Sequence, residues 1–124
     1  MGKRLMAFLL ILCLGTAALA APALAVVEQS EEFYVNDDAG VLSPETEQTI
    51  CAYNAQLEAL CSGAQMVFVM VNYSDGLYAD EYATQLFNDW GVGSATENNG
   101  ILVLGIVQEN KGWMVQGSGL KSAL

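Results

Sequence analysis

The sequence predicts an α/β layered sandwich, and two apolar runs with a helical pattern between them carry this prediction. Residues Met66–Val71 and Ile101–Val107 are apolar without alternation, which is typical of strands that are buried on both faces. The helical pattern between them is long enough to cross over a sheet. We therefore expect the two strands to be parallel and joined by a right-handed crossover.

The residues before the first run predict an ordered start, a turn and a long helix. Order begins at 33–35, and Asn36–Gly40 is rich in residues that tolerate turns. Ser43-Pro44-Glu45 is a helix start, because serine caps free amides and proline and glutamate favour the first turn. Gly63 is expected to end this helix. One stripe of apolar residues predicts its buried face: Ile50, Tyr53, Leu57 and Leu60.

A second helix is predicted from six apolar residues at positions i, i+3, i+4, i+7, i+8 and i+11. This spacing indicates an amphipathic helix with an aromatic core face. Gly91 and Gly93 end the pattern, and the polar segment Ser94–Gly100 is expected to form a loop. The six residues are Ala79, Tyr82, Ala83, Leu86, Phe87 and Trp90.

After the second strand the sequence predicts a hairpin. Gln108–Gly112 forms the turn, and Trp113–Gln116 returns as a third, antiparallel strand. Gly117–Gly119 then breaks the sheet, and residues 120–124 look like the opening of another helix. Three strands with two helices leave an apolar face poorly covered, so we expect an incomplete domain.

The first 25 residues have the layout of a secretory signal peptide. A basic start precedes an apolar run from Leu5 to Leu14, and small residues lead to the expected cleavage point after Ala25. Cleavage would leave a flexible acidic segment at 26–32 and one domain at 33–124, with no transmembrane helix of its own. The alternative is an uncleaved membrane anchor, because the apolar stretch nearly reaches spanning length.

The composition of the mature chain excludes several classes of function. Two lysines remain against 14 acidic residues, a formal charge of −12, and there is no arginine or histidine. Nucleic-acid binding requires a basic footprint and is therefore not expected. Histidine triads, histidine zinc sites and arginine-dependent cysteine phosphatases are excluded as well. The acidic surplus suits Ca²⁺ or Mg²⁺, or it only keeps an exported protein soluble.

The two cysteines of the mature chain, Cys51 and Cys61, are not expected to pair. On one helix they lie ~15 Å apart along the axis, whereas a disulfide allows a Cα separation of about 7 Å. Cys61 shares the apolar stripe of the first helix, so we expect it to be buried as a small apolar residue.

Three aspartates are the candidate metal ligands: Asp37, Asp38 and Asp75. The first two precede the first helix, and the third follows the strand at 66–71. These loops and the Gln108-Glu109 turn fall at the carboxyl ends of the strands, where open α/β sheets bind ligands. Calcium and magnesium take such carboxylates at ~2.0–2.6 Å. The alternative is that the aspartates only build their turns.

The opposite end of the sheet collects glycines and asparagines. Glycine permits close backbone approach, and asparagine tolerates left-handed turns, so loop geometry is the main interpretation. Contact with a ligand or partner is the alternative. The residues are Gly93, Asn98, Asn99, Gly117 and Gly119.

Five motifs, in order, resemble the TPM domain family, and the resemblance covers residues 33–124. VNDDAGVLSPE at 35–45 resembles the opening of that domain, and Gly63–Gln65 stand before the first core strand. The third motif combines Tyr82-Ala83, Leu86-Phe87-Asn88 and Trp90–Gly93. The fourth is Asn98–Leu104, and the fifth is Gly117–Leu120.

This resemblance implies a three-layer α/β/α, Rossmann-like sandwich with a mixed sheet that continues beyond Leu124. It also implies export or membrane tethering, and Asp37 matches an aspartate of the family. Some members are credited with acid phosphatase activity and calcium or magnesium binding, and others look like auxiliary factors of membrane complexes. The chain departs from the pattern at Lys111, the one basic residue of its hairpin, and at Lys121, where glutamate is common.

We therefore expect an exported TPM-domain protein that acts as an extracytoplasmic interaction or auxiliary module. Its expected partner is a membrane-protein complex or another envelope component, and its expected cofactor is Ca²⁺ or Mg²⁺. The alternative is a metal-dependent acid phosphatase, in which a cation held by carboxylates polarises a phosphate ester and activates water. The fold by itself does not decide between them, and the sequence assigns no catalytic residue.

Overall fold

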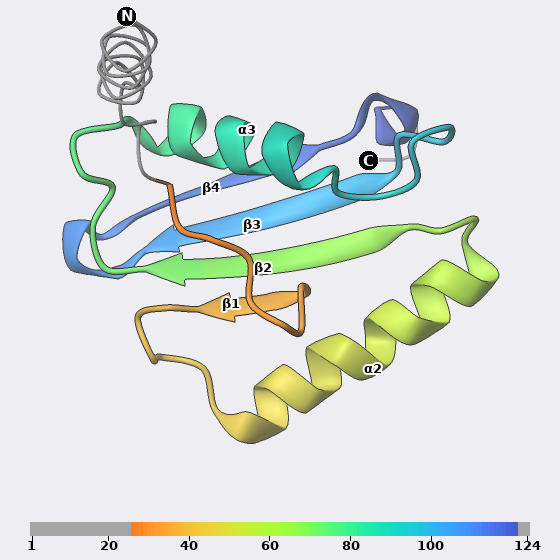
Figure 1. Ribbon diagram of the computed structural model, residues 1–124, viewed down its shortest axis with the longest axis horizontal. Coiled ribbons are helices and arrows are strands. Elements are labelled where there is room, and N and C mark those ends of the chain that lie inside the picture. Colours follow the sequence, from red (N-terminus) through yellow and green to blue (C-terminus); the bar gives the residue numbers. More distant parts are fainter. Residues whose placement is uncertain (1–25, 122–124) are drawn as a thin grey trace, which may run out of the picture.

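The computed structural model describes residues 26–121. The predicted signal segment, 1–25, lies outside the described residues, as does the end of the expected further helix, 122–124. Within these residues, two helices, four strands and two short 3₁₀ turns follow one another (Figure 1). They are β1 (Val35–Asp37), α2 (Pro44–Leu60), β2 (Gln65–Val71), α3 (Ala79–Trp90), β3 (Gly100–Ile106), η2 (Val107–Glu109), β4 (Lys111–Gln116) and η3 (Ser118–Leu120).

The four strands form one mixed sheet in the order β1-β2-β3-β4. β1, β2 and β3 are parallel, and β4 is antiparallel to β3, which confirms the predicted mixed α/β arrangement. Helix α3 packs against β3 and β4, and α2 packs against β1 and β2 on the opposite face. The fold therefore has a helical layer on each side of the sheet, as the sequence predicts.

Strand β1 is the element that the sequence analysis misses. Residues Asn36 and Asp37 were expected in a turn, but they pair in parallel with Val69 and Met70 of β2. The N–H of Phe68 donates to the carbonyl of Tyr34 at 2.8 Å, which extends the pairing by one residue. A strand of three residues is too short to show any hydrophobic period, so the turn-forming residues decided the prediction. The turn itself starts two residues later than predicted, at Asp38.

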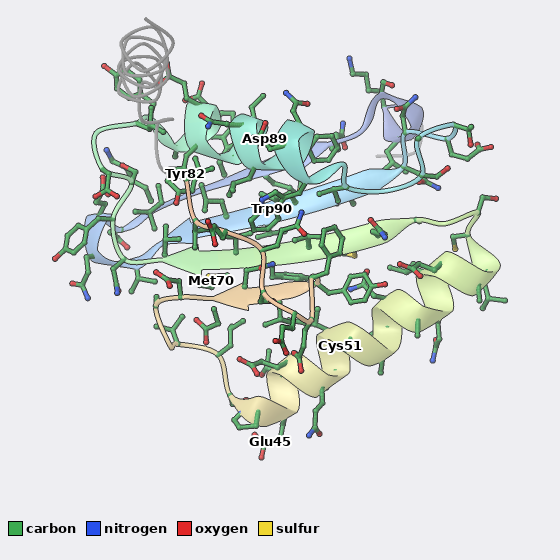
Figure 2. All side chains as sticks on the ribbon, in the orientation of Figure 1. Glu45, Cys51, Met70, Tyr82, Asp89 and Trp90 are labelled. Carbon is green, nitrogen blue, oxygen red and sulfur yellow. The ribbon has the colours of Figure 1, made fainter. Side chains whose placement is uncertain are left out.

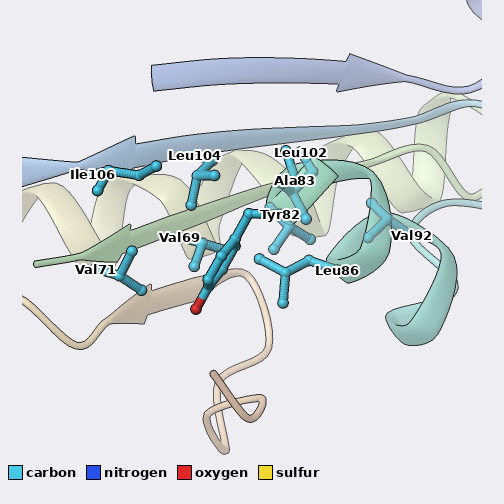
Figure 3. Close-up of a cluster of buried hydrophobic side chains, with 10 residues drawn as sticks. Val69, Val71, Tyr82, Ala83, Leu86, Val92, Leu102, Leu104 and Ile106 are labelled. Atoms are coloured by element: carbon cyan, nitrogen blue, oxygen red, sulfur yellow. The ribbon is translucent and has the colours of Figure 1, made fainter. Parts of the chain in front are cut away.

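The main core lies between α3 and the sheet (Figure 3). Helix α3 has the bounds predicted for it, and it ends at Gly91, whose left-handed φ of 61° suits glycine. Tyr82, Ala83 and Leu86 face the sheet and are almost wholly buried. They pack on one face of β2 and β3, formed by Val67, Val69, Val71, Leu102, Leu104 and Ile106.

Helix α2 starts as predicted but packs far less. The hydroxyl oxygen of Ser43 accepts the N–H of Thr46 at 3.2 Å. Of the predicted apolar stripe, Ile50 and Leu57 are only partly buried. Tyr53 is 63% exposed and Leu60 81% exposed, so the predicted buried face is wrong at these positions. The buried side chain of α2 is Asn54, at 1% exposure.

The two cysteines among residues 26–121, Cys51 and Cys61, are free thiols, as predicted. Cys61 caps the end of α2 and is exposed, so the prediction that it is buried is wrong. It lies one residue past the end of α2, next to Leu60, which is also exposed. Cys51 is partly buried.

The face of the sheet that carries α2 is incompletely covered, as the element count predicted. Met66 and Phe68 on β2 line an apolar groove beside α2 and are partly buried. On β4, Met114 points to this same face through its pairing with Val103, and 57% of its side chain is exposed. Within residues 26–121, no helix is both long and apolar enough to span a membrane.

Candidate functional site

The loops after β1 and β2 border a hollow of about 400 Å³ at the carboxyl end of the sheet. Asp38 and Asp75 both line it, together with the amide side chain of Asn72. The apolar part of its wall comes from Val71, at the end of β2, and from Tyr82 of α3. The parallel β1 and β2 bring these two loops together, as the topology argument predicts.

Asp37, the third candidate ligand, has a structural role in its loop. Its Oδ1 accepts the N–H of Val41 at 3.0 Å, and its Oδ2 accepts the N–H of Leu42 at 2.8 Å. Both carboxylate oxygens thus satisfy backbone amides between β1 and α2. Asp37 borders a neighbouring hollow of about 310 Å³, which Asp38 also lines.

Asp75 occupies a strained position in its turn. Its φ is 52°, in the left-handed region that asparagine and aspartate tolerate better than most residues. Gly76 follows with a φ of 91°, so the Asp-Gly pair turns the chain sharply. The side chain of Asp75 is left exposed at the edge of the hollow.

Tyr82 is a residue of this site that the sequence analysis assigned only to the core. Its ring is 3% exposed, while its hydroxyl oxygen accepts the N–H of Val27 at 3.0 Å (Figures 2 and 3). Burial raises the pKa of Tyr82, the Val27 hydrogen bond opposes this, and the charges of Asp75 and Asp38 raise the pKa further. The two carboxylates therefore act on the same phenol. The signal available in the sequence was the polar hydroxyl group of Tyr82 on an otherwise apolar helix face.

Glu109 fixes the loop after β2 and was not predicted to do so. Its carboxylate accepts the N–H of Ser74 at 2.5 Å and the hydroxyl of Ser74 at 3.1 Å. The Ser74 side chain is 2% exposed, so this pairing satisfies a buried polar group. The two residues are 35 positions apart, and no local pattern reveals such a pair.

The described residues offer a limited set of metal ligands. Within 26–121, no group of three or more aspartate, glutamate, cysteine or histidine side chains is placed to hold one metal ion. The hollow does combine the carboxylates of Asp38 and Asp75 with the amide of Asn72. These oxygen donors are of the type that calcium and magnesium prefer, with water completing the shell.

The loop between β2 and α3 also exposes two tyrosines. Tyr73 is 60% exposed and lines the hollow, and Tyr78 is 72% exposed at the start of α3. Tyrosine combines a large apolar area with a hydroxyl, and it is enriched at protein interfaces. The carboxyl end of the sheet therefore presents aromatic surface beside acidic groups.

The asparagines and glycines at the opposite end build loops, which agrees with the main interpretation of the sequence. The Nδ2 of Asn99 donates to the carbonyls of Cys61 and Ser62 at 3.0 and 3.2 Å. A Cβ atom added at Gly117 would overlap the carbonyl oxygen of Asn98. Glycine is thus required where the chain after β4 passes close to the 93–100 loop.

Comparison with known proteins identifies related sequences and structures. The TPM domain model matches residues 35–124. The solution NMR structure of the N-terminal domain of the cg2496 protein from Corynebacterium glutamicum superposes with a TM-score of 0.60 at 17% sequence identity. That match covers 83% of this chain and 66% of the other chain, so this chain spans somewhat less than two thirds of its neighbour. No curated protein matches the sequence.

Proposed function

Because the chain belongs to the TPM domain family, we propose that it is an exported interaction module that docks onto a membrane-protein complex or another envelope partner. The observation that carries this proposal is the exposed aromatic surface at the carboxyl end of the sheet. Tyr73 and Tyr78 are 60% and 72% exposed on one loop. Tyrosine is enriched at protein interfaces relative to the rest of the protein surface.

We further propose that Ca²⁺ or Mg²⁺ binds in the hollow beside these tyrosines. Asp38 and Asp75 would supply carboxylate oxygens, and Asn72 would supply an amide oxygen. Asp37 would support the site from the adjacent loop, since its oxygens already accept the amides of Val41 and Leu42. A bound cation would offset part of the −12 charge of residues 26–124 and would order the loops that present the tyrosines.

A calcium and magnesium titration of the exported protein, followed by amide chemical shifts, tests the cation site. We expect saturable shifts around Asp38, Asn72 and Asp75, and we expect their loss in the Asp38→Asn, Asp75→Asn double variant. Asp89→Asn is the matched control, because Asp89 is an exposed carboxylate on the outer side of α3 (Figure 2). Shifts that are absent, or that disappear equally in the control, would remove the cation from the proposal.

The partner contact is tested separately from the cation. Replacing both Tyr73 and Tyr78 by serine should weaken capture of envelope proteins by the immobilised exported protein, with the amide spectrum otherwise unchanged. Tyr53→Ser provides the control, because Tyr53 is 63% exposed on α2, far from this loop in the fold. Equal capture by the Tyr73/Tyr78 variant and by the unmodified protein would contradict the proposed contact.

Export itself has a measurable consequence at the hollow. Cleavage after Ala25 would create an α-amino group on Val26, and Val26 lines the hollow with Asp38 and Asp75. An ammonium there would compete with a divalent cation. Calcium affinity should therefore rise as the pH increases through about 7.7–8.0, the usual α-amino pKa. N-terminal sequencing of the exported protein tests the cleavage point directly.

A metal-dependent acid phosphatase is the second candidate, and the name of the matched family model, which includes the word phosphatase, favours it. With no arginine in residues 26–124, a cation held by Asp38 and Asp75 would have to polarise the phosphate ester. Metal-dependent hydrolysis of p-nitrophenyl phosphate that is lost in Asp38→Asn, but kept in Asp89→Asn, would support this activity. Hydrolysis that is unaffected by Asp38→Asn would count against this site.

A further inference from the structure

The two edges of the sheet differ in how far other segments of the chain cover them. At the β1 edge, the hydroxyl of Ser30 donates to the carbonyl of Val35 at 2.6 Å, and the N–H of Ser30 donates to the side chain of Asn36 at 2.6 Å. The segment before β1 thus covers that edge. β4 forms the other edge, and no strand among residues 26–121 pairs with its outer side. An uncovered edge is a template for another extended chain.

The hydrogen-bond alternation shows which backbone groups of β4 point outward. Gly117 donates its N–H to the carbonyl of Gly100 at 2.8 Å, so this antiparallel pair is a hydrogen-bonded one. Alternate residues of an antiparallel pair face the partner strand. The backbone N–H and C=O groups that point to β3 are therefore those of Lys111, Trp113 and Val115. The backbone groups that point outward are those of Gly112, Met114 and Gln116.

The side chains of β4 flank this edge on both faces of the sheet. Trp113 pairs with Leu104 and lies on the α3 face, where it is 50% exposed. Met114 pairs with Val103 and lies on the α2 face, where it is 57% exposed. An added strand would bury part of both, so backbone pairing and apolar contact would act together.

The charge around the edge differs from that of the rest of the chain. Lys111 begins β4 and Lys121 follows η3, and these are the two lysines of a mature chain with 14 acidic residues. No acidic residue lies between them. The nearest acidic residue before β4, Glu109, has its carboxylate on Ser74. The two lysines thus flank the edge strand in the sequence, and the backbone of Glu97 lies beside η3.

We infer that the outer edge of β4 binds an extended acidic segment of a partner protein as a fifth strand. The backbone groups of Gly112, Met114 and Gln116 would pair with it, and the two lysines would favour carboxylates at its ends. A second copy of this chain would bring the same lysines to the seam and no carboxylate from its own β4, so charge complementarity favours the acidic partner. This contact extends the proposed interaction role but does not depend on the cation hollow.

Binding of two designed peptides to the exported protein tests the inference. Both peptides have blocked termini and a sequence in which valine and threonine alternate. One peptide ends in glutamates and the other ends in lysines. We expect amide shifts concentrated at 111–117, with the glutamate peptide binding roughly threefold to tenfold more tightly. Calcium shifts at the hollow are recorded separately, so failure of the cation site and failure of this inference are distinguishable.

Two variants separate backbone pairing from charge. Met114→Pro removes an outward N–H, and proline is tolerated on edge strands, so the fold should persist while both peptides lose binding. The Lys111→Glu, Lys121→Glu variant keeps the backbone and should reverse the preference towards the lysine peptide. Unchanged affinities in a folded Met114→Pro variant, or an unchanged preference in the lysine variant, would overturn the inference. So would a dimer that Met114→Pro dissociates, because it would assign the edge to a second copy.

Discussion

Helices α2 and α3 lie on opposite faces of one sheet, but different forces hold them. Helix α3 contributes Tyr82, Ala83 and Leu86 to the core, and each is at most 3% exposed. Helix α2 contributes one buried side chain, and that side chain is the polar Asn54. Apolar burial therefore fixes α3, whereas α2 depends mainly on hydrogen bonds.

The hydrogen bonds of α2 compensate for the shortness of β1. The pairing of β1 with β2 begins at Phe68, so Met66 has no strand partner on that side. Asn54 replaces the missing strand: its Nδ2 donates to the Met66 carbonyl at 2.8 Å, and its Oδ1 accepts the Met66 N–H at 2.7 Å. A side-chain amide thus completes the sheet edge, and it anchors the helix in doing so.

The largest expected effect contrasts the two faces directly. Leu86→Ala should lower the free energy of unfolding by about 2–5 kcal/mol, because Leu86 is fully buried and its loss leaves a cavity. Leu57→Ala on α2 should cost roughly 1 kcal/mol, because Leu57 is partly buried. Urea unfolding of both variants measures the difference. Equal losses would mean that the two faces are equally packed and would remove the contrast.

The next effect tests whether a polar side chain anchors α2. Asn54→Ala leaves the N–H and C=O of Met66 without these partners, which should cost about 1–3 kcal/mol. Asn88→Ala, at an exposed position on α3, is the matched control and should change stability by less than about 0.5 kcal/mol. Hydrogen exchange at the Met66 amide should accelerate in Asn54→Ala only. An unaltered exchange rate would show that Asn54 is not the anchor.

This contrast explains how far the sequence predicts the fold. Periodicity identifies α3, and unbroken apolar runs identify β2 and β3, almost to the residue, because burial of a regular element leaves a pattern in the sequence. It predicts a buried stripe on α2 by the same logic, but Tyr53 and Leu60 are exposed. The pattern records which residues are apolar and does not record whether another element covers them. β1 is not predicted, because a strand of three residues is too short to show a hydrophobic period.

The candidate site was predictable in its location and less so in its residues. Topology places the loops of Asp38 and Asp75 together, and a shared hollow borders both. The role of Asp37 in holding the amides of Val41 and Leu42 depends on side-chain direction, which spacing does not encode. The same is true of the long-range bond between Glu109 and Ser74.

A smaller effect concerns the exposed part of the predicted stripe. Leu60→Ser should change the free energy of unfolding by less than about 0.5 kcal/mol, because Leu60 is 81% exposed at the end of α2. Thermal unfolding of this variant against the unmodified protein measures it. A loss close to that of Leu86→Ala would show that Leu60 is buried in solution, and the α2 face would then be better covered than the structure shows.

The smallest effect is the pH dependence of the polar contacts of α2. The Tyr34 hydroxyl donates to the Glu58 carboxylate, and Gln65 donates to the same oxygen at 2.9 Å. The hydrogen bond from Tyr34 is the main cause that lowers the pKa of Glu58, and the bond from Gln65 is the second. The Tyr34–Glu58 hydrogen bond also raises the pKa of Tyr34 to about 12. Both groups lie near the surface, so solvent screening keeps their contribution small.

The sign of each shift fixes the pH window. The lowered pKa of Glu58 stabilises the fold above the ordinary value of 4.5, and this contribution is lost as the pH falls through the folded pKa. The raised pKa of Tyr34 stabilises the fold below 10.0, and this contribution is lost as the pH rises towards about 12. The stability difference between the unmodified protein and Tyr34→Phe should therefore be greatest between these limits and shrink at both ends. Tyr53→Phe, at a tyrosine of α2 that is 63% exposed, is the control variant. A Tyr34→Phe difference that stays constant with pH would mean that α2 is not held by the Tyr34–Glu58 pair.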